Sequence, residues 1–209
     1  MYHFDYVSKK ESAPYKAKLI ELLNKVQDNL RDKFTFQFTF IGSSSRNMIT
    51  FDPTTNVGFD FDVNITVNDD EENYSPEEIR MVLHSALSRF MTACGYNKCE
   101  QSKRVITIKA VDPWKARINH SCDFAIVHEG PSGQQYIRFN KERKYFSWEF
   151  QTQPYKKLKS RADYLKENEY WNEVLKVYRD KKNFNNNPKK HSRSLYAETI
   201  NECFMQHYK

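Results

Sequence analysis

Alternating apolar and polar residues predict two β-strands in the first third of the chain. In residues 34–42 (FTFQFTFIG) the first, third, fifth and seventh positions are Phe, and the run ends at a glycine followed by three serines. Residues 58–67 (GFDFDVNITV) alternate in the same way. Because a strand places successive side chains on opposite faces, Asp60 and Asp62 share one face of this second strand. The other face is apolar and consists of Phe59, Phe61, Val63, Ile65 and Val67.

Apolar residues at helical spacing predict helices before and after these strands. Pro14 suits the first turn of a helix, so we expect the first helix to cover 14–33. Ser75-Pro76-Glu77-Glu78 has the pattern of a capping box, and the helix that it starts is expected to end near Gly95. Further strands are expected at 104–111 and within 116–129, followed by a turn and a returning strand at 134–139. Helices are expected from Pro154 onward, interrupted by a polar, basic loop at 184–194.

This order of elements predicts an α+β (mixed α/β) fold in which helices flank a mixed β-sheet. We expect one domain over residues 1–153 and a short C-terminal helical extension, 154–209, packed on it. The composition agrees with a folded domain, because 39% of the 209 residues are hydrophobic and 15% are aromatic. The formal net charge of +6 is a moderate excess that suits an anionic partner such as a nucleotide or RNA.

The sequence also predicts a cytoplasmic protein. The first residues are polar and mixed in charge, unlike a signal peptide, and no run approaches the roughly 18 apolar residues of a membrane span. No membrane association is therefore expected, and the cysteines are expected to be reduced. Their spacing does not match a zinc ribbon, and His120-x-Cys122 lacks a second ligand pair at a suitable spacing.

The carboxylates of Asp60 and Asp62 are the strongest candidates for a functional site. Side chains at i and i+2 of a strand lie close enough to share a hard divalent cation such as Mg²⁺, which prefers oxygen ligands. A bound dication would also offset the repulsion between the two charges. An isolated Asp-x-Asp is more simply explained as a solvated sheet face, so its context decides between the two interpretations.

That context includes a predicted phosphate-binding turn and a third acid. Where the first strand ends, Gly42 lets a phosphate approach the backbone, Ser43 and Ser44 add hydroxyl groups, and Arg46 adds a charged fork. Later in the chain, Asp123 lies inside the apolar run CDFAIV (122–127). Two other acids fit less well: Asp52 and Asp112 each precede a proline and are expected in turns.

Together, Gly42-Ser43, Asp60-x-Asp62 and Asp123 resemble the DNA polymerase β-like nucleotidyltransferase superfamily. Its pattern is a strand that ends in Gly-Ser, a following Asp-x-Asp strand, and a third acid on a later strand. The resemblance covers about residues 15–150. It is nearest to bacterial and phage relatives of the signalling nucleotidyltransferases, which are similar to oligoadenylate synthetases and CD-NTases.

The resemblance implies that residues 1–153 are a catalytic domain for two-metal nucleotidyl transfer. A nucleoside monophosphate would pass from an NTP to an acceptor hydroxyl on tRNA or another RNA, a protein or a small molecule, with release of pyrophosphate. Two Mg²⁺ ions, or Mn²⁺ in their place, would be held by Asp60, Asp62 and Asp123. Asp123 would also be the general base. Because the helical extension is short, a single transfer is expected rather than chain elongation or cyclic-dinucleotide synthesis.

Basic residues near the C-terminus are weaker candidates. Lys157 and Arg161 lie one helical turn apart, and the resemblance implies that such residues can reach the triphosphate. A solvated basic face explains them equally well. Two other functions stay open: a catalytically inactive nucleotide sensor or scaffold with the same fold, and an RNA-binding module based on the basic residues 189–193. Tyr145, Phe146 and Trp148 are candidates for stacking on a base, or for the core.

Overall fold

The computed structural model describes residues 2–69, 72–151, 157–187 and 189–208. They form two compact units, each of which is described separately. The sheet unit consists of Val7–Ile49 and Thr55–Gln151, and the helical unit consists of Met1–Tyr6, Thr50–Thr54 and Thr152–Lys209. The predicted α+β fold, with a mixed sheet and flanking helices, is confirmed.

A seven-stranded mixed sheet is the centre of the sheet unit, and its main path runs β2-β4-β7-β6-β5. Strands β4 and β7 are parallel, and every other neighbouring pair is antiparallel. Strand β7 pairs with β6 as far as Ala125 and with β8 from Val127 onward, and β8 pairs with β9. The strands are β2 (Thr35–Ile41), β4 (Val57–Asn68), β5 (Lys98–Gln101), β6 (Val105–Asp112), β7 (Arg117–Gly130), β8 (Gly133–Asn140) and β9 (Tyr145–Phe150).

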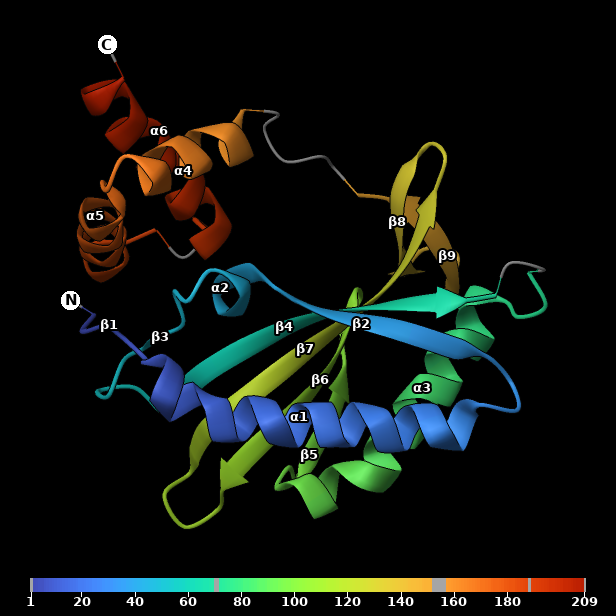
Figure 1. Ribbon diagram of the computed structural model, residues 1–209. Helices are drawn as coiled ribbons and strands as arrows, with labels where there is room; N and C mark the ends of the chain where they lie inside the picture. Colours follow the sequence, from blue (N-terminus) through green and yellow to red (C-terminus); the bar gives the residue numbers. More distant parts are fainter. Residues whose placement is uncertain (1, 70–71, 152–156, 188, 209) are drawn as a thin grey trace. The chain divides into compact units, whose positions relative to one another are not determined.

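Helices α1 (Lys9–Leu30) and α3 (Pro76–Phe90) lie on the same side of the sheet (Figure 1). Their apolar residues form one core with the buried face of β4, where Phe61, Val63 and Ile65 are at most 1% exposed. The short 3-10 helix η1 (Met91–Cys94) follows α3, and the four-residue helix α2 (Gly42–Ser45) follows β2. The alternation predicted for residues 58–67 is confirmed, because Asp60 and Asp62 lie on the face away from this core.

The predicted start of the first helix was wrong by five residues. Helix α1 begins at Lys9 rather than at Pro14, because Ser8 and Glu11 form a capping box. The Ser8 side chain accepts from the Glu11 backbone N–H, and the Glu11 side chain accepts from the Ser8 backbone N–H. These bonds satisfy N–H groups that a helix start leaves without partners, so the cap decided the start of the helix and Pro14 lies inside it.

Strands β5 and β9 were not predicted from the sequence, although Tyr145–Trp148 had been singled out for their rings. Strand β5 has only four residues (KCEQ) and no apolar alternation, so its pairing with β6 depends on tertiary contacts. Strand β9 completes a hairpin with β8, in which Phe139 lies opposite Phe146. The strands predicted at 104–111, 116–129 and 134–139 are confirmed as β6, β7 and β8.

The helical unit joins the two ends of the described chain. It contains α4 (Leu158–Glu167), α5 (Trp171–Asn183) and α6 (Ser192–His207), together with the two-stranded ribbon of β1 (Asp5–Tyr6) and β3 (Thr50–Phe51). The Tyr6 hydroxyl donates to the carbonyl of Leu175 at 2.7 Å, and Arg179 pairs with Asp5 at 2.9 Å. Helix α6 begins at Ser192, two residues before the predicted end of the basic loop at 194.

The packing of the C-terminal helical extension on the rest of the chain stays a prediction. Among the described helices, none combines the length and the apolar character that crossing a bilayer requires. All four cysteines are free.

Candidate active site

The structure brings Asp60, Asp62 and Asp123 together on the face of the sheet away from α1 and α3. In the parallel ladder of β4 and β7, Asp62 lies opposite Asp123 and Asp60 lies opposite Ser121. One oxygen from each of the three carboxylates lies within 4.8 Å of the others. Within the described parts of the chain, this is the only such grouping of His, Cys, Asp or Glu side chains.

Strand register explains why residues so far apart in the sequence meet here. Ile41 lies opposite Asp62, Asp62 opposite Asp123, and Asp123 opposite Thr107. These four residues form one row across β2, β4, β7 and β6. Asp62, Asp123 and the Thr107 hydroxyl therefore lie side by side, and Gly42 comes directly after the residue at the end of the row.

Burial raises the pKa of all three carboxyl groups, and repulsion from Asp123 raises the pKa of Asp60 and Asp62 further. Desolvation is the largest cause for each of them. For Asp60, desolvation and the charge of Asp123 raise the pKa to about 7. The charge of Asp123 also raises the pKa of Asp62, whereas Arg46 acts in the opposite direction. Without a cation, the cluster is therefore costly to ionise at neutral pH.

Two hydroxyl groups hold two of these carboxylates in place. Ser121 Oγ donates to Asp60 Oδ1 at 2.8 Å, and Thr107 Oγ1 donates to Asp123 Oδ1 at 2.5 Å. Both hydrogen bonds favour the ionised form and oppose the rise in pKa. Sequence reasoning missed Ser121 and Thr107, although Ser121 stands two residues before Asp123 and so shares its face of the strand.

Asp62 is positioned by the shape of the turn at Gly42. Gly42 has φ +65°, in the left-handed region that favours glycine. A Cβ atom at this position would lie 3.1 Å from Asp62 Cγ and would collide with Asp62 Oδ2. The absence of a side chain at residue 42 therefore lets the turn close against the carboxylate.

The predicted phosphate-binding residues follow this turn. The Ser44 hydroxyl donates to the carbonyl of Ile41 at 2.9 Å, so its proton is engaged within the turn. No hydrogen bond to the Ser43 hydroxyl is found among the described residues. The charge of Arg46 acts on Asp62, so Arg46 lies on the same side of the cluster as the turn. The use of Gly42, Ser43, Ser44 and Arg46 to hold phosphates stays a prediction.

The other sequence candidates belong to the helical unit. Lys157 immediately precedes α4 in the helical unit, and Arg161 lies within α4 with its guanidinium over the Phe204 ring at 4.8 Å. Their role at a triphosphate stays a prediction. In the loop before α6, Lys190 pairs with Glu198 at 2.7 Å.

The two acids expected in turns do accept hydrogen bonds there. Asp52 is 1% exposed, and it accepts from the backbone N–H groups of His3 and Thr54. Asp112 accepts from the N–H groups of Trp114 and Lys115. Neither belongs to the cluster that the structure groups around Asp123.

The chemistry of the acidic cluster fits a hard divalent cation. It offers carboxylate oxygens from two strands, and hydroxyl donors orient two of its three members. The Asp62 carboxylate receives no hydrogen bond from any residue that the structure describes, so its oxygens are available as ligands. A dication would remove the repulsion that raises these pKa values.

Comparison with known proteins places this fold among nucleotidyltransferases. No protein-family model matches the chain, and no curated protein matches its sequence. Among solved structures, the cyclic AMP-GMP synthase DncV of Vibrio cholerae, bound to nonhydrolyzable GTP, matches with a TM-score of 0.58 and 18% identity over 91% of this chain. The CD-NTase CdnG of Bradyrhizobium diazoefficiens, bound to GTP, matches with a TM-score of 0.51 and 14% identity over 68% of this chain.

The matched regions are only part of these neighbours. This chain covers 54% of the DncV chain and 39% of the CdnG chain. DncV is also described as a prokaryotic cGAS homolog. The structural neighbours are thus CD-NTases and cGAS-like nucleotidyltransferases, which confirms the resemblance predicted from the sequence at the level of the fold.

Proposed function

We propose that this protein is a Mg²⁺-dependent nucleotidyltransferase that moves a nucleoside monophosphate from an NTP to an acceptor hydroxyl. The observation that carries the proposal is the convergence of Asp60, Asp62 and Asp123 beside the turn at Gly42. The nucleotidyltransferase fold supports it, because neighbours with this fold were crystallised with GTP. The acidic cluster and the fold both support nucleotidyl transfer in general. The acceptor is to be identified by experiment.

Asp60, Asp62 and Asp123 are the residues that would hold the metal ions. When bound, Mg²⁺ would supply positive charge to the triphosphate and lower the pKa of the acceptor hydroxyl. In this proposal Gly42 would let a phosphate approach the backbone after β2, and the Ser43 hydroxyl would donate to it. Arg46 adds a positive charge on this side of the cluster.

The transfer itself exchanges one P–O bond for another. The acceptor oxygen bonds to the α-phosphorus, the bond from the α-phosphorus to the bridging oxygen breaks, and pyrophosphate leaves. Asp123 is the residue we assign to receive the hydroxyl proton. Its Oδ1 accepts from Thr107, no described residue donates to its Oδ2, and burial raises its pKa toward that of a useful base.

Single transfer to a separate acceptor is our preferred form of the reaction. One neighbour was crystallised with the linear intermediate 5′ pppA(3′,5′)pG, in which two nucleotides are joined. This chain spans about half of that protein, with 53% coverage, and a joined dinucleotide is among the products to be tested.

The first experiment measures binding of each nonhydrolysable NTP by isothermal titration, with Mg²⁺ or with EDTA. The test variant is Asp60→Asn with Asp62→Asn, and the matched control is Asp28→Asn with Asp32→Asn. The control changes the net charge equally at exposed positions on and after α1. We expect Mg²⁺-dependent binding in the wild type and the control, and none in the test variant. Unchanged binding in the test variant would refute the proposed site.

The second experiment separates an enzyme from an inactive sensor. Each α-labelled NTP is incubated with Mg²⁺ and a panel of RNAs, proteins and small hydroxyl compounds. Transfer of label to an acceptor, or into a dinucleotide, with release of pyrophosphate supports the enzyme. Label that remains entirely in NTP, despite Mg²⁺-dependent binding, identifies the sensor.

A further inference from the structure

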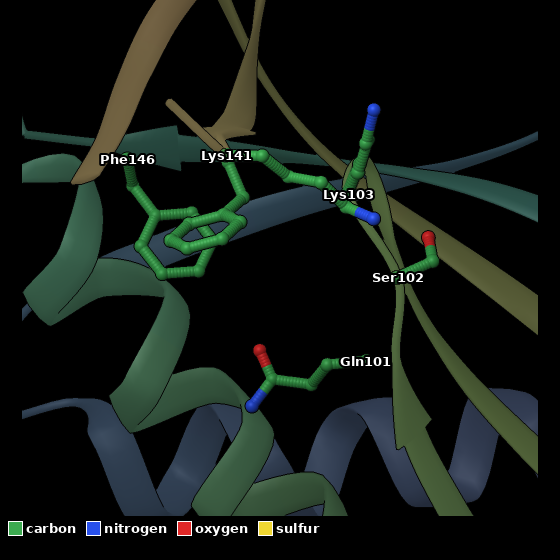
Figure 2. A pocket seen from close by; sticks show the side chains of 6 residues that line it. Gln101, Ser102, Lys103, Lys141 and Phe146 are labelled. Carbon is green, nitrogen blue, oxygen red and sulfur yellow. The ribbon is translucent and has the colours of Figure 1, made fainter. Parts of the chain in front are cut away.

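A pocket lies on the opposite side of the sheet from the acidic cluster. Its volume is about 370 Å³, within the usual range for small-molecule sites. It lies between the turn after β5 and the β8–β9 hairpin, which are joined by a hydrogen bond of 2.8 Å from Phe139 N to Lys103 O. The lining residues are Gln101, Ser102, Lys103, Phe139, Lys141 and Phe146 (Figure 2).

Strand register shows that this pocket and the acids use different faces. Glu100 lies opposite Thr107, whose hydroxyl is bonded to Asp123 on the acidic face. Gln101 is the next residue, so its side chain points to the other face, where it accepts a hydrogen bond from Arg80 of α3. The pocket is therefore not part of the proposed active site.

A buried positive charge lies behind the pocket wall. Arg80 is 0% exposed and makes no ion pair with any described residue. Its Nε donates to Gln101 Oε1 at 3.1 Å, one Nη2 bond goes to Ser102 O at 2.8 Å, and its guanidinium lies 5.2 Å from the Phe146 ring centre. All three of these partners line the pocket. The other terminal nitrogen, Nη1, is buried without a hydrogen-bond partner.

Two more cations stand at the pocket without acidic partners. Lys103 and Lys141 are exposed, and neither forms an ion pair within the described residues. In Figure 2 both lysine side chains lie above the pocket, with Phe146 to the left and Gln101 below. Three positive charges therefore surround one small pocket, and an anion would offset their mutual repulsion.

The remaining lining residues suit a flat ring. Phe139 and Phe146 lie with their ring centres 5.0 Å apart at 50°, and both are partly exposed. Aromatic faces of this kind are common platforms for bases. Because the Gln101 oxygen accepts from Arg80, the amide is oriented, and its NH₂ group has no partner among the described residues.

We propose that this pocket binds a phosphorylated nucleoside, with the base against Phe139 and Phe146 and the phosphate on Lys103 and Lys141. The ligand is either a free mononucleotide or one unit of a single-stranded nucleic acid. The exposed residues Arg143 and Lys144 follow Lys141 in the hairpin turn and would extend the basic surface for a strand. This site is independent of the proposed function, because it uses none of the residues assigned to nucleotidyl transfer.

The test uses the full chain carrying Asp60→Asn and Asp62→Asn, in EDTA, so that metal-dependent binding at the acidic cluster does not contribute. The probes are AMP, adenosine, inorganic phosphate and a 5′-phosphorylated oligoadenylate, measured by isothermal titration. Lys103→Gln with Lys141→Gln removes the two cations, and both positions are exposed, so folding should be retained. The matched control, Lys10→Gln with Lys115→Gln, removes the same charge from exposed positions outside the pocket.

We expect the dissociation constant of AMP to rise about tenfold or more when the two pocket lysines are replaced, and to change little in the control. Adenosine and inorganic phosphate, which each supply half of the ligand, should bind more weakly than AMP. If the oligoadenylate alone binds in this lysine-dependent manner, the ligand is a strand. Phe146→Leu should weaken AMP more than inorganic phosphate. The proposal is overturned if neither AMP nor the oligoadenylate binds, or if the two lysine pairs have equal effects.

Discussion

Replacing Gly42 by Ala should disrupt the candidate active site far more than it disrupts the fold. Gly42 has φ +65°, and its Cβ would meet the Asp62 carboxylate. The substitution therefore has two separable consequences. The first is a backbone penalty that any residue with a Cβ incurs in the left-handed region. The second is displacement of Asp62, one of the three grouped acids.

A second glycine separates these consequences. Gly95 also has a left-handed backbone, with φ +89°, but a Cβ there would meet only Lys18 Nζ at 3.7 Å, an ordinary contact. Gly42→Ala and Gly95→Ala should each lower the free energy of unfolding by about 1–2 kcal/mol. Only Gly42→Ala also moves a carboxylate, and misplacement by about 1 Å can cost on the order of 100-fold in function.

The assay pairs urea unfolding with titration of Mg²⁺ and a nonhydrolysable NTP. We expect similar losses of stability in the two variants. We expect metal-dependent affinity to fall by about two orders of magnitude in Gly42→Ala and by about twofold or less in Gly95→Ala. If Gly42→Ala binds like the wild type, the turn does not position Asp62. If Gly95→Ala loses as much affinity, the loss comes from the fold and not from the site.

Three further predictions concern the charges of the cluster. In metal-free buffer near pH 8, Asp60→Asn with Asp62→Asn should raise the free energy of unfolding by about 1–3 kcal/mol, because the substitutions remove desolvated like charges. Addition of Mg²⁺ should raise the melting temperature of the wild type but not of this variant. The pKa of Asp60 is raised to about 7 in the folded state, so the folded protein binds more protons than the unfolded chain between its ordinary value, 3.8, and about 7. The free energy of unfolding in EDTA should therefore fall as pH rises through this window, and urea unfolding should show a smaller fall in Asp60→Asn. The same pH dependence in both proteins would contradict the raised pKa of Asp60. Thr107→Val removes the hydrogen bond that lowers the pKa of Asp123, so Mg²⁺ should have to compete with a proton on Asp123 up to higher pH than in the wild type. We therefore expect Mg²⁺ affinity, measured by isothermal titration across the pH range, to fall most at low pH and to recover as pH rises. A loss of affinity that is independent of pH would point to misfolding.

Strand alternation was sufficient to predict where the acids lie. Burial of Phe61 and Val63 requires the intervening Asp62 to face away from the core, and the same period of two places Asp123 opposite the core in its own strand. The glycine after the first strand was also identifiable from sequence. These predictions depend on local periodicity, which a single sequence displays directly.

Features that depend on pairing between distant segments could not be predicted in this way. The hydrogen bond from Thr107 to Asp123 follows from the register of β6 on β7, which no local pattern specifies. The pocket on the other side of the sheet combines a turn at 102–104 with a hairpin about forty residues later, a separation evident from the sequence numbers alone. The start of α1 was missed for a different reason, since the capping residues Ser8 and Glu11 are local and the prediction was based on Pro14.

The row that runs from Ile41 through Asp62 and Asp123 to Thr107 has a consequence for evolution. Backbone ladders hold these positions together, so loops between the strands can lengthen, shorten or change composition while the geometry of the acidic cluster is kept. A single residue inserted inside one of the strands would instead turn its acid toward the hydrophobic interior. A geometry that depends on so few ladder positions is compatible with a similar fold at 14% to 18% identity.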